Sequence, residues 1–218
     1  LRSTYTLGST PATQGLSEFP MITAPGIGTY QNDPVQKQGT GGDDGYLQDS
    51  AAGTMDDGVA GGTDWVNNAS TQQALLGVFN GAFYIDNTTK KPTWANFVAA
   101  SQAFGTNYNT GSSDGIGFVN DNPFQEYVVK ADAAITIAKM MYTLTYAIND
   151  GATGTAGTDE LSGQSLITLD IGSETAAGAG QKMFNIVRVT NDPLNSDNSA
   201  TNSNVVVKFA PGSIGSLS

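Results

Sequence analysis

The sequence contains no cysteine and no histidine. Their absence excludes disulfide bonds, thiol nucleophiles, thiolate and imidazole metal ligands, and every catalytic triad in which histidine is the base. It also removes the side chain whose unperturbed pKa makes it a switch near neutral pH. Carboxylates are therefore the only acid–base groups present in number.

Charge is also scarce, and positive charge in particular. Charged residues make up 13% of the 218 residues, and the net charge is −11, whereas soluble domains usually contain about 25% charged residues. An acidic surface repels phosphate groups, which argues against a nucleic-acid partner and against polybasic attachment to a membrane. No segment approaches the ~20 apolar residues of a transmembrane helix. We expect neither nucleic acid nor a membrane as a partner.

Polarity comes instead from Asn, Thr, Ser and Gln, together with 27 glycines. This composition favours many turns and short strands over long salt-bridged helices. We predict a mainly β protein, with a compact β-barrel or β-sandwich domain, one short helix and long loops rich in Gly, Asn and Asp. Residues 1–64 are expected to form an extended N-terminal arm and a surface loop, or to belong to the same β domain. Residues 65–218 are expected to form the main β-rich domain.

The stretch LLGVFNGAFYID at 75–86 has an unusual pattern for a strand. Alternate side chains of a strand point to opposite faces, and here both faces are mostly apolar. One face carries Leu75, Gly77, Phe79, Gly81, Phe83 and Ile85, and the other carries Leu76, Val78, Asn80, Ala82, Tyr84 and Asp86. Glycine within a strand marks a bulge or a close backbone approach. We therefore expect this strand to be sandwiched, either between two sheets or against another subunit.

The remaining elements follow from turn residues and periodicity. Pairs of strands around a turn are expected within 75–98 and within 116–132, and single strands within 164–172, 182–192 and 203–212. One helix is expected at 131–144, with Asp132 as its cap and Ile135, Ala138, Met141 and Tyr142 near one face. Long loops are expected at 39–64 and 105–115.

Two groups of carboxylates are the candidates for chemistry. The first long loop contains Asp43, Asp44, Asp49, Asp56 and Asp57. Their spacing is not that of a calcium-binding loop, so we interpret them as solvated. Glu126, Asp132, Asp170 and Glu174 flank expected strands, but their spacing identifies no facing pair of the kind a glycosidase needs. We predict no catalytic, cofactor-binding or metal site and no enzyme activity, with a carboxylate hydrolase using Glu126 as the enzymatic alternative.

Several segments together resemble structural proteins of tailed-bacteriophage virions. LLGVFNGAFYIDNTTKKPTWANFV at 75–98 resembles a block with a GVF-x-G strand, a turn and an aromatic-rich return strand. GFVNDNPFQEYVVKADAA at 117–134 is similar to GxVxDDPxxxFEVQAD in that family. QKMFNIVRVTNDPLNSDNSATNSNVVVKF at 181–209 looks like the family's ending, and LRSTYTLGSTPATQG followed by TYQNDPV looks like its opening, with Asn-Asp-Pro in place of Gly-Asp-Pro. The resemblance leaves out mainly 39–64 and 150–180.

The family in question is that of capsid decoration, or cement, proteins. The resemblance implies a β-rich virion protein on the outer face of the capsid, with the phage major capsid protein as partner and with itself as a homodimer or homotrimer. Such a protein stabilises the shell by bridging neighbouring capsid subunits. Candidate interface anchors are Phe79, Phe83, Tyr84 and Trp94, because aromatic residues dominate interface hot spots. Residues 1–38 are the expected strap, and an edge of the strand at 75–86 offers a further contact by addition to a neighbouring sheet.

Two other roles stay open at this point. A phage head fibre or adhesin that binds host-surface glycans would use loop tyrosines, for which Tyr30, Tyr46 and Tyr108 are candidates. A surface-layer or filament subunit outside any virus would have the same low charge and the same abundance of Thr, Asn and Gly. Glycan binding would favour the first role, and assembly of the pure protein into sheets or fibres would favour the second.

Overall fold

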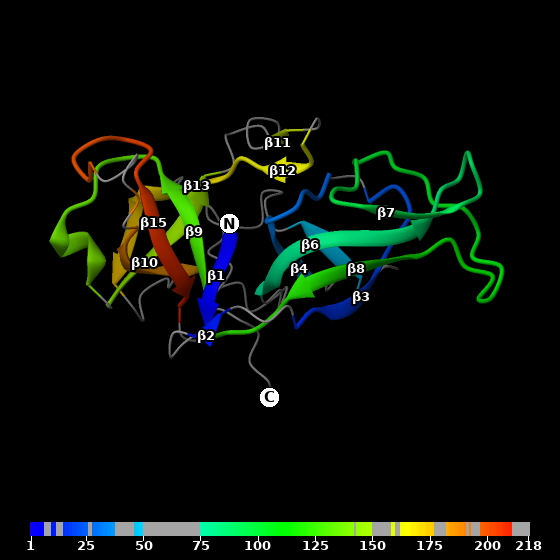
Figure 1. The fold of residues 1–218 in the computed structure, drawn as a ribbon, viewed down its shortest axis with the longest axis horizontal. Helices are drawn as coiled ribbons and strands as arrows, with labels where there is room; N and C mark the ends of the chain where they lie inside the picture. The colour runs from blue at the N-terminus through cyan, green and yellow to red at the C-terminus, as the bar shows by residue number, and fades with distance from the viewer. Residues whose placement is uncertain are drawn as a thin grey trace.

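The structure of the protein is a computed structural model. It describes residues 1–6, 10–11, 15–25, 28–37, 46–49, 75–141, 143–149, 158–159, 162–176, 182–190, 192 and 197–210. The chain is mainly β, as predicted, and the helical content of the described residues is one 3₁₀ turn. Two sheets contain most of the strands and lie side by side along the long axis of the molecule (Figure 1).

Seven strands form the first sheet, a nearly closed barrel. Their order is β13-β10-β14-β15-β9-β1-β2, and a parallel pairing of β13 with β9 closes the ring. These strands are β1 (Arg2–Thr6), β2 (Thr10–Pro11), β9 (Gln125–Ala131), β10 (Leu144–Asn149), β13 (Thr168–Ala176), β14 (Phe184–Val189) and β15 (Asn204–Phe209). The three single strands predicted in the C-terminal third are thus confirmed as β13, β14 and β15.

Six strands form the second sheet, in the order β3-β8-β6-β4-β5 with β7 also paired to β6. They are β3 (Ser17–Met21), β4 (Pro34–Lys37), β5 (Leu47–Asp49), β6 (Leu75–Ile85), β7 (Pro92–Ala95) and β8 (Gly115–Asn120). The predicted strand pair within 75–98 is confirmed as β6 and β7. The pair predicted within 116–132 is also present, but its members enter different sheets, because β8 joins the six-stranded sheet and β9 joins the barrel. A short ladder of β11 (Thr158–Asp159) and β12 (Gln164–Ser165) lies apart from both sheets.

A β-bulge in β6 changes which side chains face inward. The pairing of β6 with β8 shifts register between Phe79 and Gly81, and Gly81 has a φ of 134°, which L side chains rarely adopt. Before the bulge Phe79 faces the core of the six-stranded sheet, and after it the core-facing residues are Ala82 and Tyr84. The simple alternation expected over 75–86 is therefore wrong beyond Phe79, because one extra residue reverses the two faces. It also fails at the start of the strand, where the pairing with β4 shifts register between Gly77 and Leu75.

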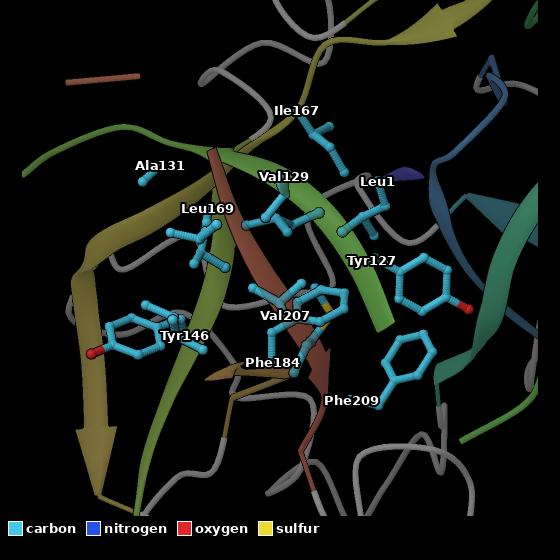
Figure 2. Close-up of a cluster of buried hydrophobic side chains, with 14 of the residues drawn as sticks. Leu1, Tyr127, Val129, Ala131, Tyr146, Ile167, Leu169, Phe184, Val207 and Phe209 are labelled. Atoms are coloured by element: carbon cyan, nitrogen blue, oxygen red, sulfur yellow. The ribbon is translucent and has the colours of Figure 1, made fainter. Parts of the chain in front are cut away.

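Each sheet has its own hydrophobic core, and β6 contributes to both. The barrel core contains Tyr127, Tyr146, Leu169, Phe184, Val207 and Phe209 among others (Figure 2). The other core contains Met21, Val35, Leu47, Phe79, Ala82, Tyr84, Val98, Phe104 and Val119. Leu75 and Val78, at the start of β6, belong to the barrel core. The first half of β6 is therefore sandwiched as predicted, with the barrel covering its second face.

Polar contacts also join the two sheets. In Figure 2, Tyr127 and Phe209 lie on the side of the barrel core nearest β6, and the Tyr127 hydroxyl donates to the Asn120 carbonyl of β8 at 3.4 Å. Gln31 pairs with the segment before β13, since its N–H donates to the Gly163 carbonyl and its carbonyl accepts from the Ser165 N–H, both at 2.9 Å. The two sheets are thus joined by strand β6 and by the Tyr127–Asn120 bond, and Gln31 joins β12 to the loop before β4.

The helix predicted at 131–144 is wrong. Strand β9 continues to Ala131, and the described part of this segment is helical only in the 3₁₀ turn Ile137–Met140, none of which is buried. Asp132 does not cap a helix, because its Oδ1 accepts from the Ile171 N–H at 2.9 Å and so bridges to β13. Pairing of this segment with β13 and β15 outweighs a modest helix propensity, as long-range packing commonly does. Tyr142 lies outside the described residues.

Segments of the N-terminal arm contribute strands to both sheets. Strand β1 pairs with β9 of the barrel, and β3, β4 and β5 belong to the six-stranded sheet. These described segments are therefore paired within the chain's own two sheets, and the strap role of 1–38 stays a prediction. Within 39–64 only residues 46–49 are described, where Leu47 is buried. The rest of that predicted loop lies outside the described residues.

Candidate interface on the outer face of the six-stranded sheet

The outer side of the second half of β6 carries a row of apolar side chains. Phe83 lies opposite Trp94 of β7 and Ile116 of β8, and Ile116 lies opposite Pro20 of β3. Phe83 is 39% exposed and Trp94 is 50% exposed. Phe118, two residues along β8, joins this row through Trp94. We name these five residues the aromatic face.

Trp94 is held in place by a glycine and a second ring. A Cβ at Gly81 would lie 2.8 Å from Cζ2 of Trp94, so only glycine allows the indole to rest on the bulge. The rings of Trp94 and Phe118 have centroids 4.8 Å apart and are tilted by 48°, a favourable geometry for aromatic pairs. An exposed aromatic side chain that is already ordered loses little entropy on binding a partner. Trp94 therefore has the properties of a preorganised anchor.

Strands β3, β6 and β7 are less suited to edge-to-edge assembly than this face. Strand β6 is paired with β8 on one side and with β4 and β7 on the other, so the predicted addition of its edge to another sheet is wrong. The edge strand β3 contains Pro20, and β7 begins at Pro92. Proline has no N–H to donate to an added strand and commonly protects sheet edges.

The structure separates the four predicted anchors into two pairs. Phe79 is 0% exposed and Tyr84 stacks on Phe104 at 4.5 Å within the core, so both stabilise the sheet and are unavailable to a partner. Phe83 and Trp94 are on the outer surface, as an anchor must be. Pro20, Ile116 and Phe118 were not predicted from the sequence as part of this surface. The alternation in GIGFVN over β8 could have indicated that Ile116 and Phe118 face outward, because the two glycines face the core.

A second apolar area lies on the barrel. Ile137 is 85% exposed and Met141 is 57% exposed, and both belong to the 3₁₀ turn or directly follow it. Met140 from the same turn packs against the barrel core, which holds the turn on the barrel. We name Ile137 and Met141 the barrel turn. The aromatic face and the barrel turn lie on different sheets, so one chain presents two separate apolar contact areas.

The carboxylates considered for catalysis have structural partners. Glu126 forms an ion pair with Arg188 at 2.8 Å, and Glu174 forms one with Lys139 at 3.4 Å. Asp170 accepts from the Gly172 and Ser173 N–H groups at 2.8 and 3.1 Å. Burial raises the pKa of Asp170, and the charge of nearby Asp132 raises it further. The structure thus brings Asp132 and Asp170 together, but each carboxylate accepts hydrogen bonds from strand backbone.

No metal centre emerges from the described residues, which contain no group of three or more acidic side chains able to hold an ion. Of the acidic residues predicted to be solvated in the first long loop, Asp43, Asp44, Asp56 and Asp57 lie outside the described residues. The backbone of Asp49 belongs to β5.

We expect an Asp170→Asn variant to be at least as stable as the wild type at neutral pH. The folded-state pKa of Asp170 is raised, so the unfolding free energy falls as pH rises from the unfolded value, about 4, through the folded value. Asparagine removes this loss and keeps an oxygen for the two N–H donors. Urea unfolding between about pH 4 and pH 7 measures the effect.

Asp197→Asn is the matched control, for which we expect the opposite change in stability. Hydrogen bonds from the Ser199 hydroxyl and N–H lower the pKa of Asp197, so its contribution is present at neutral pH and is lost as pH falls through the folded pKa. This variant is expected to lose stability at neutral pH. A loss of stability at pH 7 in Asp170→Asn would contradict the assignment.

The tyrosines considered for glycan stacking differ in how exposed they are. Tyr30 is buried and stacks on Phe97 at 5.4 Å, so it is unavailable to a sugar. The Tyr46 hydroxyl donates to the Asp114 carboxylate at 3.1 Å. Tyr108 is 82% exposed. A glycan site built from these three tyrosines is therefore contradicted by the burial of Tyr30.

Comparisons of the chain with protein families, with curated proteins and with solved structures find no match. Among the described residues, no helix is long and apolar enough to cross a membrane.

Proposed function

We propose that the protein is a virion structural protein that binds the outer surface of a tailed-phage capsid and stabilises it by bridging major capsid subunits. The observation that carries this proposal is the uncovered aromatic face. Trp94 and Phe83 lie on the surface of a sheet in which the edge strands β3 and β7 contain proline. An exposed apolar surface of this kind fits another protein better than a small ligand, which is usually held in a concave site.

Bridging requires at least two contact areas on one protomer. The aromatic face and the barrel turn supply two, one on each sheet, and the sheets are joined through β6 and the Tyr127–Asn120 bond. Pulling two capsid subunits apart would then also break the contacts of the bridging protein. Repeated contacts on one lattice raise the avidity well above that of a single interface.

The test uses capsids that lack the protein. Purified protein is added, the particles are imaged, and their disruption temperature is measured. The proposal predicts regular density on the outer lattice and a raised disruption temperature. An absence of binding, or binding at a few vertices without stabilisation, would contradict it and favour a fibre or adhesin role, which a glycan array tests directly.

Variants at the barrel turn test whether this area contacts the capsid. We expect Ile137→Asp to weaken capsid binding roughly tenfold or more, because a charge at the centre of an apolar contact must be desolvated without a partner. Tyr108→Asp is the matched control, since Tyr108 is equally exposed but lies outside both contact areas. Equal loss of binding in both variants would contradict a role for the barrel turn.

A further inference from the structure

Three of the nine basic residues lie on one side of the barrel, although the chain has a net charge of −11. Lys130 is on β9, Lys208 on β15 and Arg188 on β14, and these three strands are neighbours in the sheet (Figure 1). Val129 and Val207, next to the two lysines in the chain, belong to the barrel core. Because successive side chains of a strand point to opposite faces, Lys130 and Lys208 point to the outside of the barrel.

Arg188 is held on the same outer side by an ion pair that crosses β15. Arg188 lies opposite Val206 of β15, whose two chain neighbours are in the barrel core, and its Nη1 is 2.8 Å from Oε2 of Glu126 on β9. Glu126 lies opposite Lys208, two residues along β15 from Val206. The arginine side chain therefore passes over the outer side of β15, which explains why the outward-facing Val206 is only 3% exposed.

The charge that this side of the barrel presents to solvent is positive. In the ion pair the Arg188 side chain is 47% exposed, whereas the Glu126 side chain is 13% exposed. Lys130 is exposed and Lys208 is partly exposed. Asp192 also lies here, where it accepts a hydrogen bond from an amide at the start of β15 at 3.5 Å. Cations therefore outnumber anions on this part of the described surface, and we name Lys130, Arg188 and Lys208 the basic face.

Apolar side chains border the basic face. Phe124, directly before β9, is 60% exposed, and Val187, beside Arg188 at the bulge of β14, is 37% exposed. The turn that carries Phe124 has a fixed backbone, because Asn122 accepts from the Phe124 N–H through Oδ1 at 2.9 Å and from the Gln125 N–H through its carbonyl at 3.1 Å. Aromatic residues and arginine are enriched where proteins meet other proteins.

We propose that the basic face binds an acidic protein surface, whose carboxylates pair with Arg188 and the two lysines. A guanidinium presents its N–H groups in a planar fork that matches a carboxylate, and the ion pair with Glu126 already holds this one in position. Nucleic acid fits less well, because three cations are fewer than the roughly 6–10 phosphate contacts of a typical binder. The acidic remainder of the chain also repels a phosphate backbone.

This inference deepens the proposed function, on which its place in the virion rests. The 3₁₀ turn that carries the barrel turn lies against β14, the strand of Arg188, so the basic face and the barrel turn adjoin each other and would meet the same capsid subunit. The inference adds that the region of that subunit in contact with the barrel is acidic. The aromatic face, on the other sheet, is left for a second subunit.

Labelled poly-L-glutamate imitates an acidic protein surface and tests the basic face without a capsid. Fluorescence anisotropy measures its binding at ~0.15 M salt, where the Debye length of about 8 Å screens the distant negative charge of the chain but not contacts at the face. The wild type is expected to bind, and the affinity should fall at least roughly tenfold in ~1 M salt, where the Debye length is about 3 Å. Lys130→Glu is expected to bind roughly tenfold more weakly than the wild type. A wild type that does not bind poly-L-glutamate would overturn the inference.

Lys91→Glu is the matched control, because it makes the same change of charge at an exposed lysine in the turn between β6 and β7. It should bind like the wild type, and an equal loss in Lys91→Glu and Lys130→Glu would overturn the inference, since only net charge would then matter. Arg188→Gln is expected to bind roughly threefold more weakly, and urea unfolding checks that both barrel variants remain folded. Tighter binding of double-stranded DNA than of poly-L-glutamate would also overturn the inference, in favour of a nucleic-acid partner.

Failure of this inference and failure of the proposed function are distinguishable. A protein that binds poly-L-glutamate through the basic face but does not bind capsids keeps the inference and refutes the capsid role. A protein that stabilises capsids equally well as wild type and as Lys130→Glu keeps the capsid role and refutes the inference.

Discussion

A Gly77→Ala variant is expected to lose about 3 kcal/mol of unfolding free energy. A Cβ at this position would lie 2.3 Å from the Asn120 carbonyl oxygen and 2.7 Å from Cγ1 of Val119. The nearer atom is backbone in β8, so a change of rotamer cannot relieve the contact. The two strands would have to separate at the point where β6 passes from the barrel core to the core of the six-stranded sheet.

Urea unfolding of the purified variant measures this loss. Gly15→Ala is the matched control, because an added Cβ there meets nothing within 4 Å, and its stability is expected to stay within about 0.5 kcal/mol of the wild type. A Gly77→Ala variant as stable as this control would mean that β6 and β8 do not approach as described.

A Phe79→Ala variant is expected to lose about 3–5 kcal/mol of unfolding free energy. Phe79 is fully buried in the core of the six-stranded sheet, and the Phe79 N–H and carbonyl bond to the Asp33 carbonyl and the Asn32 N–H at 2.8 Å. Truncation leaves a cavity among side chains whose backbone is fixed by these bonds, so the site cannot collapse to fill it.

Phe83→Ala is the matched comparison, four residues along the same strand. Phe83 is 39% exposed on the aromatic face, so its truncation is expected to cost less than about 1 kcal/mol of unfolding free energy and to weaken the proposed capsid binding instead. Urea unfolding and capsid binding, measured on both variants, separate the two roles. Equal losses of monomer stability would contradict the assignment of inner and outer faces after the bulge.

The contrast between Phe79 and Phe83 also shows where sequence reasoning failed. Strict alternation places both rings on the same face of a strand. The bulge between Phe79 and Gly81 reverses the faces, and a bulge depends on which strands lie on either side. Gly81 was a visible sign of irregularity, but the sequence did not say that the reversal would bury Tyr84 and expose Phe83.

The helix prediction for 131–144 failed for a related reason. Its alanines, methionines and Asp132 match a helix locally. In the structure Ala131 ends β9, and the Asp132 N–H donates to the Leu169 carbonyl at 3.0 Å, a contact between residues far apart in the sequence. Local propensity differs between conformations by tenths of a kcal/mol per residue, whereas these pairings remove apolar surface and backbone groups from water together.

The sequence by itself excluded disulfide, thiol and imidazole chemistry in this chain and determined the class of its fold. The absence of histidine and cysteine and the β-branched runs were sufficient for those conclusions, because they depend on residue types and on short-range alternation. Only the tertiary structure decided that β8 and β9 enter different sheets, that β6 is shared between two cores, and which aromatic rings remain outside. Those outcomes depend on pairings between distant segments, which no local pattern encodes.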